Sequence, residues 1–330
     1  MKYLVTGSAG HLGEGLVRTL ERSGHEVLGL DIKASPFTAC HGSITDRGFV
    51  QDCLQGVDVV CHTATLHKPH VVTHSMQDFI DTNVSGTLCL LESAVQAGVG
   101  AFVFTSTTSV YGEALRPPVT EPAAWVTESL APVPKNIYGV TKLAAEGICH
   151  LVHKRHGLPV VILRTSRFFP EEDDNAAIRA KYSDDNIKAN EYLYRRVDVQ
   201  DVVDAQLCAA ARAPEIGFGR YIITATTPLK QRDLRRLRGN APEVVAQYVP
   251  HYRDVYQELG WQMFDDIERV YVNERARVEL GWSPQFDFAG IVRRLARGEP
   301  TQSQLALEIG AKGYHDEAFE EGPFPVESDP

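Results

Sequence analysis

The sequence predicts an α/β fold, in which a doubly wound parallel sheet is joined to a smaller lobe in the C-terminal half of the chain. Three observations favour it. Short, β-branched apolar runs alternate with amphipathic stretches through the first half of the 330 residues, as in a parallel sheet covered by helices. Four amphipathic stretches are each followed by a glycine, where a helix favours a left-handed C-cap; these are Gly24, Gly56, Gly98 and Gly157. A glycine-rich segment joins the first apolar run to the first amphipathic one.

The alternation gives the elements of the first half. We expect strands at residues 2–6, 26–30, 57–62, 101–105 and 159–163. We expect helices between them, at residues 11–22, 46–55, 76–97 and 137–156. Right-handed crossovers between such βα units produce a doubly wound sheet.

After residue 164 the pattern is less regular. We expect a strand at residues 221–225 and helices near residues 184–193, 202–213, 229–237, 274–280 and 288–297. Residues 298–330 include Gly310, Gly313, Pro323 and Pro325 and show little periodicity. This last segment is expected to wrap around the lobe or to trail from it.

The glycine-rich segment predicts a dinucleotide site. Residues 6–13 read TGSAGHLG, and Asp31 closes the next strand. Gly7 allows the turn, Gly10 allows close approach of a diphosphate, and Gly13 allows the helix to pack on the sheet. The diphosphate binds the free N–H groups of the helix N-terminus. A carboxylate at Asp31 accepts ribose hydroxyls and repels a 2′-phosphate, which favours NAD over NADP.

These features divide the chain into two expected parts. Residues 1–165 are predicted to form a Rossmann-type NAD-binding domain. Residues 166–330 are predicted to form the substrate-binding lobe and a C-terminal tail, with the chain crossing back to the sheet near residues 195–213.

Composition excludes several classes of partner. The formal charge of −10 and the pI near 5.6 argue against nucleic acid or an anionic membrane. No apolar run is long enough to span a bilayer, and the N-terminus reads into a strand and not into a signal peptide, so a cytoplasmic location is expected. Six cysteines without CxxC spacing are interpreted as reduced and mostly buried; they are Cys40, Cys53, Cys61, Cys89, Cys149 and Cys208.

Tyr138 and Lys142 stand four residues apart on a predicted helix and so share one face. A cation beside a phenol lowers the pKa of the phenol, which would make Tyr138 an acid or base for an alcohol or ketone. Lys142 can also donate to the nicotinamide ribose. Residues 105–109 form a hydroxyl-rich turn after a strand, at the sheet edge where α/β proteins bind ligands.

Taken together, these motifs resemble the extended short-chain dehydrogenase/reductases, and more narrowly their NAD-dependent epimerase/dehydratase branch. The resemblance rests on TGSAGHLG, Asp31, NVSGT at residues 83–87, TSTTSVYG at residues 105–112 and YGVTK at residues 138–142. It covers residues 1 to about 165 closely, and returns in RVDVQDV at residues 196–202 and ARVELGW at residues 276–282.

The resemblance implies a role for each matching residue. Tyr138 would be the acid/base, Lys142 its activator and ribose ligand, and Thr107 the hydroxyl that polarises the substrate, with Thr108 beside it. The residues implied in cofactor binding are Gly7, Gly10, His11, Leu12, Gly13, Asp31, Ile32, Ser43, Ile44, Thr63, Ala64, Asn83, Tyr138 and Lys142.

Departures from the family pattern bear on the substrate. Dehydratases of this branch carry Asp-Glu after the catalytic Thr, where this chain has Thr108-Ser109, so 4,6-dehydration is not expected. Relatives usually carry Asp at the position of Ser43, and those that bind nucleotide sugars carry Asn near Arg167. An acidic turn, residues 171–175, would repel a pyrophosphate. A small sugar or sugar acid therefore fits better than a nucleotide sugar.

Three alternatives remain open from the sequence. Arg167 would grip a substrate carboxylate bidentately, or would form a salt bridge with the acidic turn. The reaction would be a net NAD-dependent oxidation of a secondary alcohol, or an epimerisation through a transient ketone. The third alternative is a regulator that binds NAD and catalyses no reaction. The presence of both Tyr138 and Lys142 argues against it.

The surroundings of the site give four further expectations. The proline-rich residues 112–136 would form a wall or lid of the pocket, with Trp125 as an apolar contact. His62, His67, His70 and His74 fit no metal motif, so no metal is expected, although His67 or Lys68 would reach the cofactor or substrate. The helices at residues 76–97 and 137–156 match the pair that forms a homodimer interface in the family.

Overall fold

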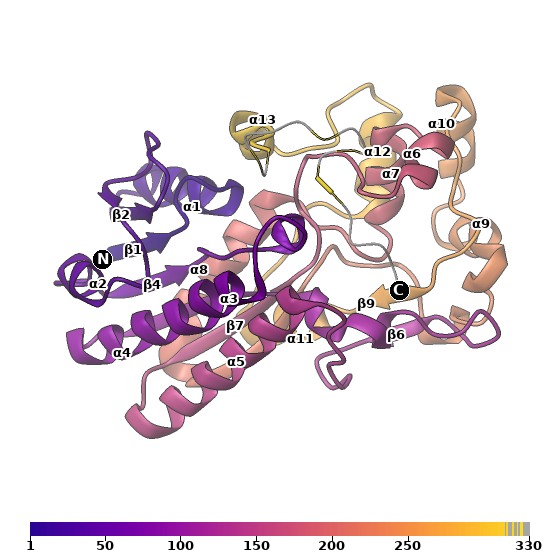
Figure 1. Cartoon of the computed structure of the whole chain (residues 1–330). Coiled ribbons are helices and arrows are strands. Elements are labelled where there is room, and N and C mark those ends of the chain that lie inside the picture. Colours follow the sequence, from indigo (N-terminus) through magenta and orange to yellow (C-terminus); the bar gives the residue numbers. More distant parts are fainter. Residues whose placement is uncertain (314, 316–318, 320–321, 323, 326–330) are drawn as a thin grey trace.

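The computed structural model describes residues 1–313, 315, 319, 322, 324 and 325. Its centre is a seven-stranded sheet in which every pairing is parallel (Figure 1). In spatial order the strands are β3 (Cys40–His41), β2 (Glu26–Asp31), β1 (Lys2–Thr6), β4 (Val59–His62), β5 (Ala101–Thr107), β7 (Val160–Thr165) and β8 (Phe218–Ile223). The chain runs from β1 outward to β3 and then returns to β4, so the order reverses between β1 and β4, which is where doubly wound sheets bind their ligands.

Helices cover both faces of this sheet, as the fold class requires. Successive residues of β1 point to opposite faces, and Val5 and Leu4 accordingly belong to two separate cores. The core containing Val5 is closed by α1 (His11–Arg22), α8 (Val199–Ile216), α11 (Glu274–Leu280) and α13 (Gln304–Ile309). The core containing Leu4 is closed by α2 (Arg47–Cys53), α4 (Thr87–Ala97) and α5 (Ile137–His156). The predicted doubly wound fold is thus confirmed.

The four predicted capping glycines behave as expected. Gly24, Gly56, Gly98 and Gly157 have φ of 77°, 69°, 71° and 72°, in the left-handed region that only glycine enters without strain. The five predicted strands and the helices at residues 11–22 and 137–156 are confirmed, with small differences at strand ends. The helix expected over residues 76–97 is divided: α3 (Met76–Phe79) continues through a π-helical stretch, η2 (Ile80–Gly86), into α4.

A second group of helices forms a lobe beyond the carboxyl ends of the strands (Figure 1). Its helices are α6 (Ala176–Lys181), α7 (Asp184–Glu191), α9 (Leu237–Tyr248), α10 (Tyr252–Leu259) and α12 (Phe288–Leu295). They share an apolar core of their own. Two short strands far apart in the sequence, β6 (Ala124–Val126) and β9 (Arg269–Tyr271), pair in parallel at its base.

Three expectations for the second half of the chain, and one for Trp125, need adjustment. The helix expected at residues 229–237 is only a 3₁₀ turn, η4 (Gln231–Asp233), because the Asp233 carboxylate caps the Lys230 N–H and closes the turn. The strand expected at residues 221–225 is present as β8, which spans residues 218–223 and belongs to the main sheet and not to the lobe. Trp125 lies in β6 and packs on the lobe core, outside the cleft described below. Residues 304–309 form α13, while Pro323 lies outside the described residues.

Within the described residues, no helix is long and apolar enough to cross a membrane.

Candidate active site

A cleft of about 2230 Å³ lies at the carboxyl ends of the sheet strands, between the sheet and the helical lobe. Most of the residues predicted to bind cofactor or substrate line it. They are Gly7, Gly10, His11, Leu12, Gly13, Asp31, Ile32, Ser43, Ile44, Thr63, Ala64, Thr107, Thr108, Tyr138 and Arg167. Lys142 and Asn83 are buried behind the wall and do not line it.

The glycine-rich turn between β1 and α1 is shaped as the sequence predicts. Gly7 has φ of 74°, and a Cβ there would lie 2.7 Å from the Ala64 nitrogen. A Cβ on Gly13 would lie 2.0 Å from the Gly7 carbonyl oxygen, so only glycine lets the first turn of α1 approach the loop this closely. Gly7 and Gly13 therefore let α1 begin directly beside the loop at the edge of the cleft, and a helix N-terminus in this position fits a dinucleotide diphosphate.

Asp31 lies at the end of β2, beside this turn. One carboxylate oxygen accepts the Ala9 N–H at 2.9 Å, and the other accepts the Lys33 N–H at 2.8 Å. These bonds fix the carboxylate against the glycine-rich turn and leave lone pairs for further donors. The position suits a ribose diol, as the sequence predicts. Ile32 and Ser43 line the cleft next to it.

Tyr138 and Thr107 come together from α5 and the end of β5. The Thr107 hydroxyl accepts the Ser109 N–H at 3.1 Å and is hydrogen-bonded to Tyr138. Burial raises the pKa of Tyr138 to about 12, and the Thr107 hydrogen bond opposes this shift. The pair thus presents a neutral phenol and a hydroxyl at one point of the cleft.

Lys142 departs from its expected arrangement. Its ammonium lies 4.1 Å from the centroid of the Phe104 ring, and burial lowers its pKa to about 7. The sequence led us to expect a pKa of Tyr138 lowered by Lys142. Burial outweighs that effect, and Lys142 is not among the groups that shift the pKa of Tyr138.

A buried ion pair that the sequence analysis missed lies behind the catalytic candidates. The Glu146 carboxylate accepts two bonds from Arg164, at 2.6 and 3.0 Å, and one from the Ser106 hydroxyl at 2.6 Å. It thereby ties α5, which carries Tyr138, to β5, which carries Thr107. The signal was present in the sequence, because Glu146 is one turn beyond Lys142 on the same helix face.

Asn83 acts on the cleft indirectly. Its side chain accepts the Leu66 N–H at 2.9 Å and donates to the Leu66 carbonyl at 2.8 Å, and it also bonds the Thr141 hydroxyl at 3.1 Å. These bonds fix the loop after β4 to α5. That loop, with Thr63 and Ala64, forms the floor of the cleft.

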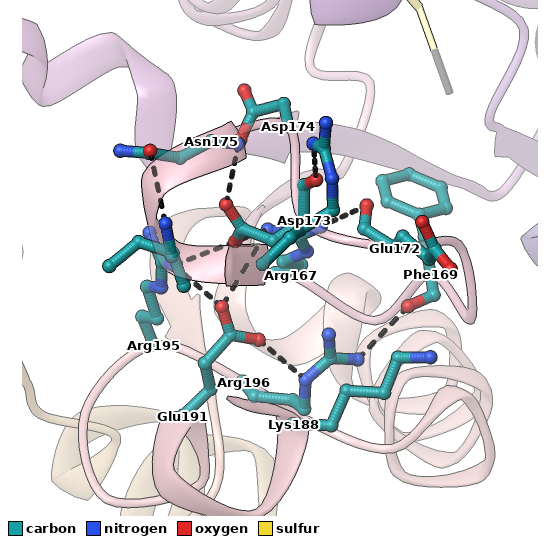
Figure 2. Close-up of polar contacts among 12 residues, drawn as sticks. Arg167, Phe169, Glu172, Asp173, Asp174, Asn175, Lys188, Glu191, Arg195 and Arg196 are labelled. Carbon is teal, nitrogen blue, oxygen red and sulfur yellow. Dashed lines mark hydrogen bonds and ion pairs between the residues drawn. The ribbon is translucent and has the colours of Figure 1, made fainter. Parts of the chain in front are cut away.

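Arg167 forms the salt bridge that was one of its two predicted alternatives. Its guanidinium lies 2.6 Å from the Asp173 carboxylate of the acidic turn and 3.6 Å from Glu191. Glu191 is fully buried, and it also pairs with Arg195 and Arg196 at 2.6 and 2.8 Å (Figure 2). Burial alone would raise the pKa of Glu191, but these guanidinium groups keep it well below its usual range. The sequence predicted the contact between Arg167 and the acidic turn but not the role of Glu191, although Arg195 follows Glu191 by four residues.

Histidine side chains gather on the cofactor side of the cleft. The ring of His70 contacts the rings of His67, His74 and His315. In the part of the chain that the structure describes, no group of three or more His, Cys, Asp or Glu residues is arranged to hold a metal ion.

Comparisons with known proteins agree with this architecture. A sequence model of the NAD dependent epimerase/dehydratase family matches residues 3–221. A dTDP-glucose 4,6-dehydratase of Streptomyces antibioticus is 29% identical over 335 residues, covering 89% of this chain and 91% of the relative. A UDP-glucose 4-epimerase of Streptomyces lividans is 33% identical over 171 residues, covering 48% of this chain and 50% of the relative. The chain spans about half or less of the length of several other relatives.

Solved structures show the same fold. A short-chain dehydrogenase/reductase superfamily protein from Agrobacterium tumefaciens with bound NAD has a TM-score of 0.63 at 23% identity, covering 93% of this chain and 99% of that one. A UDP-glucose 4-epimerase from Thermotoga maritima with UDP-glucose has a TM-score of 0.61 at 22% identity, covering 90% and 99%. The chain belongs to the NAD dependent epimerase/dehydratase family, and NAD is the cofactor of this family.

Proposed function

We propose that this protein transfers hydride between NAD and a secondary alcohol carbon of a sugar or sugar-acid substrate. One observation carries the proposal. A single cleft contains the glycine-rich turn with Asp31 on one side and the hydrogen-bonded Thr107 and Tyr138 on the other. The first group would hold the dinucleotide, and Thr107 and Tyr138 would meet a substrate hydroxyl in the same cleft.

Each residue then has a defined task. Thr107 donates to or accepts from the substrate oxygen, and Tyr138 takes the hydroxyl proton on oxidation or returns it on reduction. NAD, when bound, supplies the hydride acceptor, and its positive charge favours the phenolate. Lys142 would hold the nicotinamide ribose once its ammonium turns from the Phe104 ring toward the cleft, which it does not line in this structure. Ser106 and Glu146 fix the strand and helix that carry Thr107 and Tyr138.

Net oxidation and epimerisation use the same residues, and they differ in whether the ketone leaves before hydride returns. The relatives named as UDP-glucose 4-epimerases favour the second course. The short acidic turn first suggested a substrate without a pyrophosphate. Its carboxylates are paired, Asp173 with Arg167 and Asp174 with Lys68, which reduces that repulsion and keeps a nucleotide sugar as an alternative substrate.

The proposal is tested with the purified chain, NAD and a panel of free aldoses, uronic acids and nucleotide sugars. Absorbance at 340 nm reports NADH, and NMR reports the sugar product. NADH formed in proportion to an oxidised sugar establishes the dehydrogenase, whereas sugar interconversion without accumulating NADH establishes the epimerase. NAD binding with no turnover of any compound would favour the regulator instead.

A homodimer forms part of the proposal. Apolar side chains on α3, η2 and α5 face solvent: Met76 is 72% exposed, Ile80 40%, Val140 49% and Leu151 47%. Val140 and Leu151 are three helical turns apart and so lie on one face of α5. An exposed apolar row on two adjacent helices is a surface that a second copy of the chain would bury.

A further inference from the structure

The chain that follows α13 is attached to the cofactor side of the cleft at two places. The N–H groups of Lys312 and Gly313 donate to Glu171 Oε1 of the acidic turn, at 3.1 and 3.2 Å. Nε2 of His315 lies 2.8 Å from the carbonyl oxygen of Pro69, in the turn that follows β4. Lys312, Gly313 and His315 also line the cleft. The C-terminal segment therefore begins as part of the cleft wall.

The same segment reaches the helical lobe a few residues later. Gly322 has φ of 141°, and a Cβ there would lie 2.9 Å from the guanidinium group of Arg179 on α6. Two residues span at most about 7 Å, so Phe324 lies close to α6. Phe324 is only 7% exposed, and both Phe324 and Pro325 line the cleft. An aromatic ring of the C-terminal segment is thus part of the cleft wall on the side of the lobe.

Charge favours the same placement. Among the described residues before position 300 that line the cleft, nine are Lys or Arg and six are Asp or Glu, although the whole chain carries a formal charge of −10. The sequence of residues 314–330 has the opposite balance, with six carboxylate side chains and no Lys or Arg. An acidic stretch of sequence suits a cleft in which cations outnumber carboxylates. A pyrophosphate in that cleft would compete with it for the same cations.

The position of Phe324 bears on the size of the substrate. In the proposed function, the dinucleotide takes the part of the cleft at Asp31, and the sugar carbon reacts at Thr107 and Tyr138. Any further part of a substrate must extend away from the cofactor, toward the lobe, where Phe324 and Pro325 form part of the wall. A single sugar ring needs no such space. The nucleotide of a nucleotide sugar would meet the Phe324 ring.

We propose that Phe324 and the C-terminal segment around it close the lobe end of the cleft, so that the protein accepts a compact sugar or sugar acid and excludes a nucleotide sugar. This inference rests on the proposed hydride transfer at Tyr138, and it names the substrate class of that site. Removal of the Phe324 ring opens the space that a nucleotide requires.

The test uses uridine diphosphate as the probe and needs no turnover. Calorimetric titration in saturating NAD keeps the probe out of the cofactor site and measures its affinity for the rest of the cleft. Phe324→Ala, and a chain shortened to end at Gly313, are both expected to bind uridine diphosphate at least about tenfold more tightly than the unchanged protein, which corresponds to about 1.4 kcal/mol. Both should keep the NAD affinity of the unchanged protein.

The same segment supplies the control. Phe319 contacts the His315 ring at 5.1 Å between centroids and does not line the cleft, so Phe319→Ala removes an aromatic ring without opening the cleft. Its affinity for uridine diphosphate should equal that of the unchanged protein. Thermal melting verifies that each variant is folded.

Two results separate this inference from the proposed function. If Phe324→Ala and the shortened chain bind NAD but bind uridine diphosphate no more tightly than Phe319→Ala, the closed lobe end is overturned, and hydride transfer to a free sugar is untouched. If both bind uridine diphosphate more tightly but no protein oxidises or interconverts any sugar, the closed lobe end holds and the proposed hydride transfer fails.

Discussion

At the residue scale, the proposed chemistry depends most on the Tyr138 hydroxyl. Tyr138→Phe removes the proton-transferring group and keeps the ring that fills the wall. We expect the rate of hydride transfer to fall by about 10²–10⁴-fold, while NAD affinity, measured by fluorescence titration, stays unchanged. Equal activity in Tyr138→Phe and the unchanged protein would remove Tyr138 from the mechanism.

Lys142 gives a prediction that depends on pH. Its pKa is lowered by burial to about 7, so in the cofactor-free protein the ammonium form is lost as pH rises through about 7. A ribose hydroxyl that accepts from the ammonium favours the charged form and raises the pKa on binding. NAD binding at pH 8 should therefore take up a proton, which calorimetry in buffers of different ionisation enthalpy measures. Lys142→Met should abolish the uptake, and uptake that persists in this variant would assign the proton to another group.

Single residues were predictable where a motif fixes them and not where the fold brings distant residues together. The glycine-rich turn and Asp31 lie where the sequence placed them, because local backbone geometry demands glycine there. The pKa of Tyr138 was not predictable, because it depends on burial by the whole cleft wall. Arg195 and Arg196 stand within five residues of Glu191, but the third arginine, Arg167, could not be assigned to it, since only the fold brings them together.

At the scale of elements, the β1–α1 turn allows a sharp test. Gly13→Ala places a methyl group 2.0 Å from the Gly7 carbonyl oxygen, and the displaced backbone should cost about 1–3 kcal/mol of unfolding free energy and weaken NAD binding. Gly48→Ala on α2 meets nothing nearer than 3.7 Å and should stabilise the protein by about 0.5–1 kcal/mol. Urea denaturation measures both changes. Equal effects from the two variants would contradict the close approach of α1 to the turn.

Elements with regular periodicity were predicted well, and those shaped by tertiary packing were not. Six of the seven sheet strands, all except the two-residue β3, and α5 follow from apolar patterning alone. The π-helical stretch η2 brings Gly86 against Ile44, where a Cβ would lie 2.7 Å from the Ile44 side chain, and no local pattern announces it. Helix α9 is interrupted at residues 238–240, where Gly239 has φ of 85°, and Pro242 stands at the start of the helical stretch that follows.

At the scale of the whole molecule, the exposed face of α5 predicts the oligomeric state. Leu151→Glu places a charge on the proposed dimer contact of α5. Leu151 is 47% exposed, so the change disturbs no buried side chain. Light scattering after gel filtration should give a dimer for the unchanged chain and a monomer for Leu151→Glu. Leu307→Glu, at an equally exposed position on α13, should remain a dimer. A dimeric Leu151→Glu would move the interface to another face.

The central proposal for the whole molecule is the transfer of hydride between NAD and a sugar carbon. The most direct test mixes the protein and NAD with each compound of the sugar panel in a single turnover and follows absorbance at 340 nm. Hydride transfer that depends on Tyr138 predicts a rise in absorbance with at least one sugar, transient for an epimerase and lasting for a dehydrogenase, and no rise in Tyr138→Phe. A protein that binds NAD and shows no rise with any sugar would contradict the proposed hydride transfer.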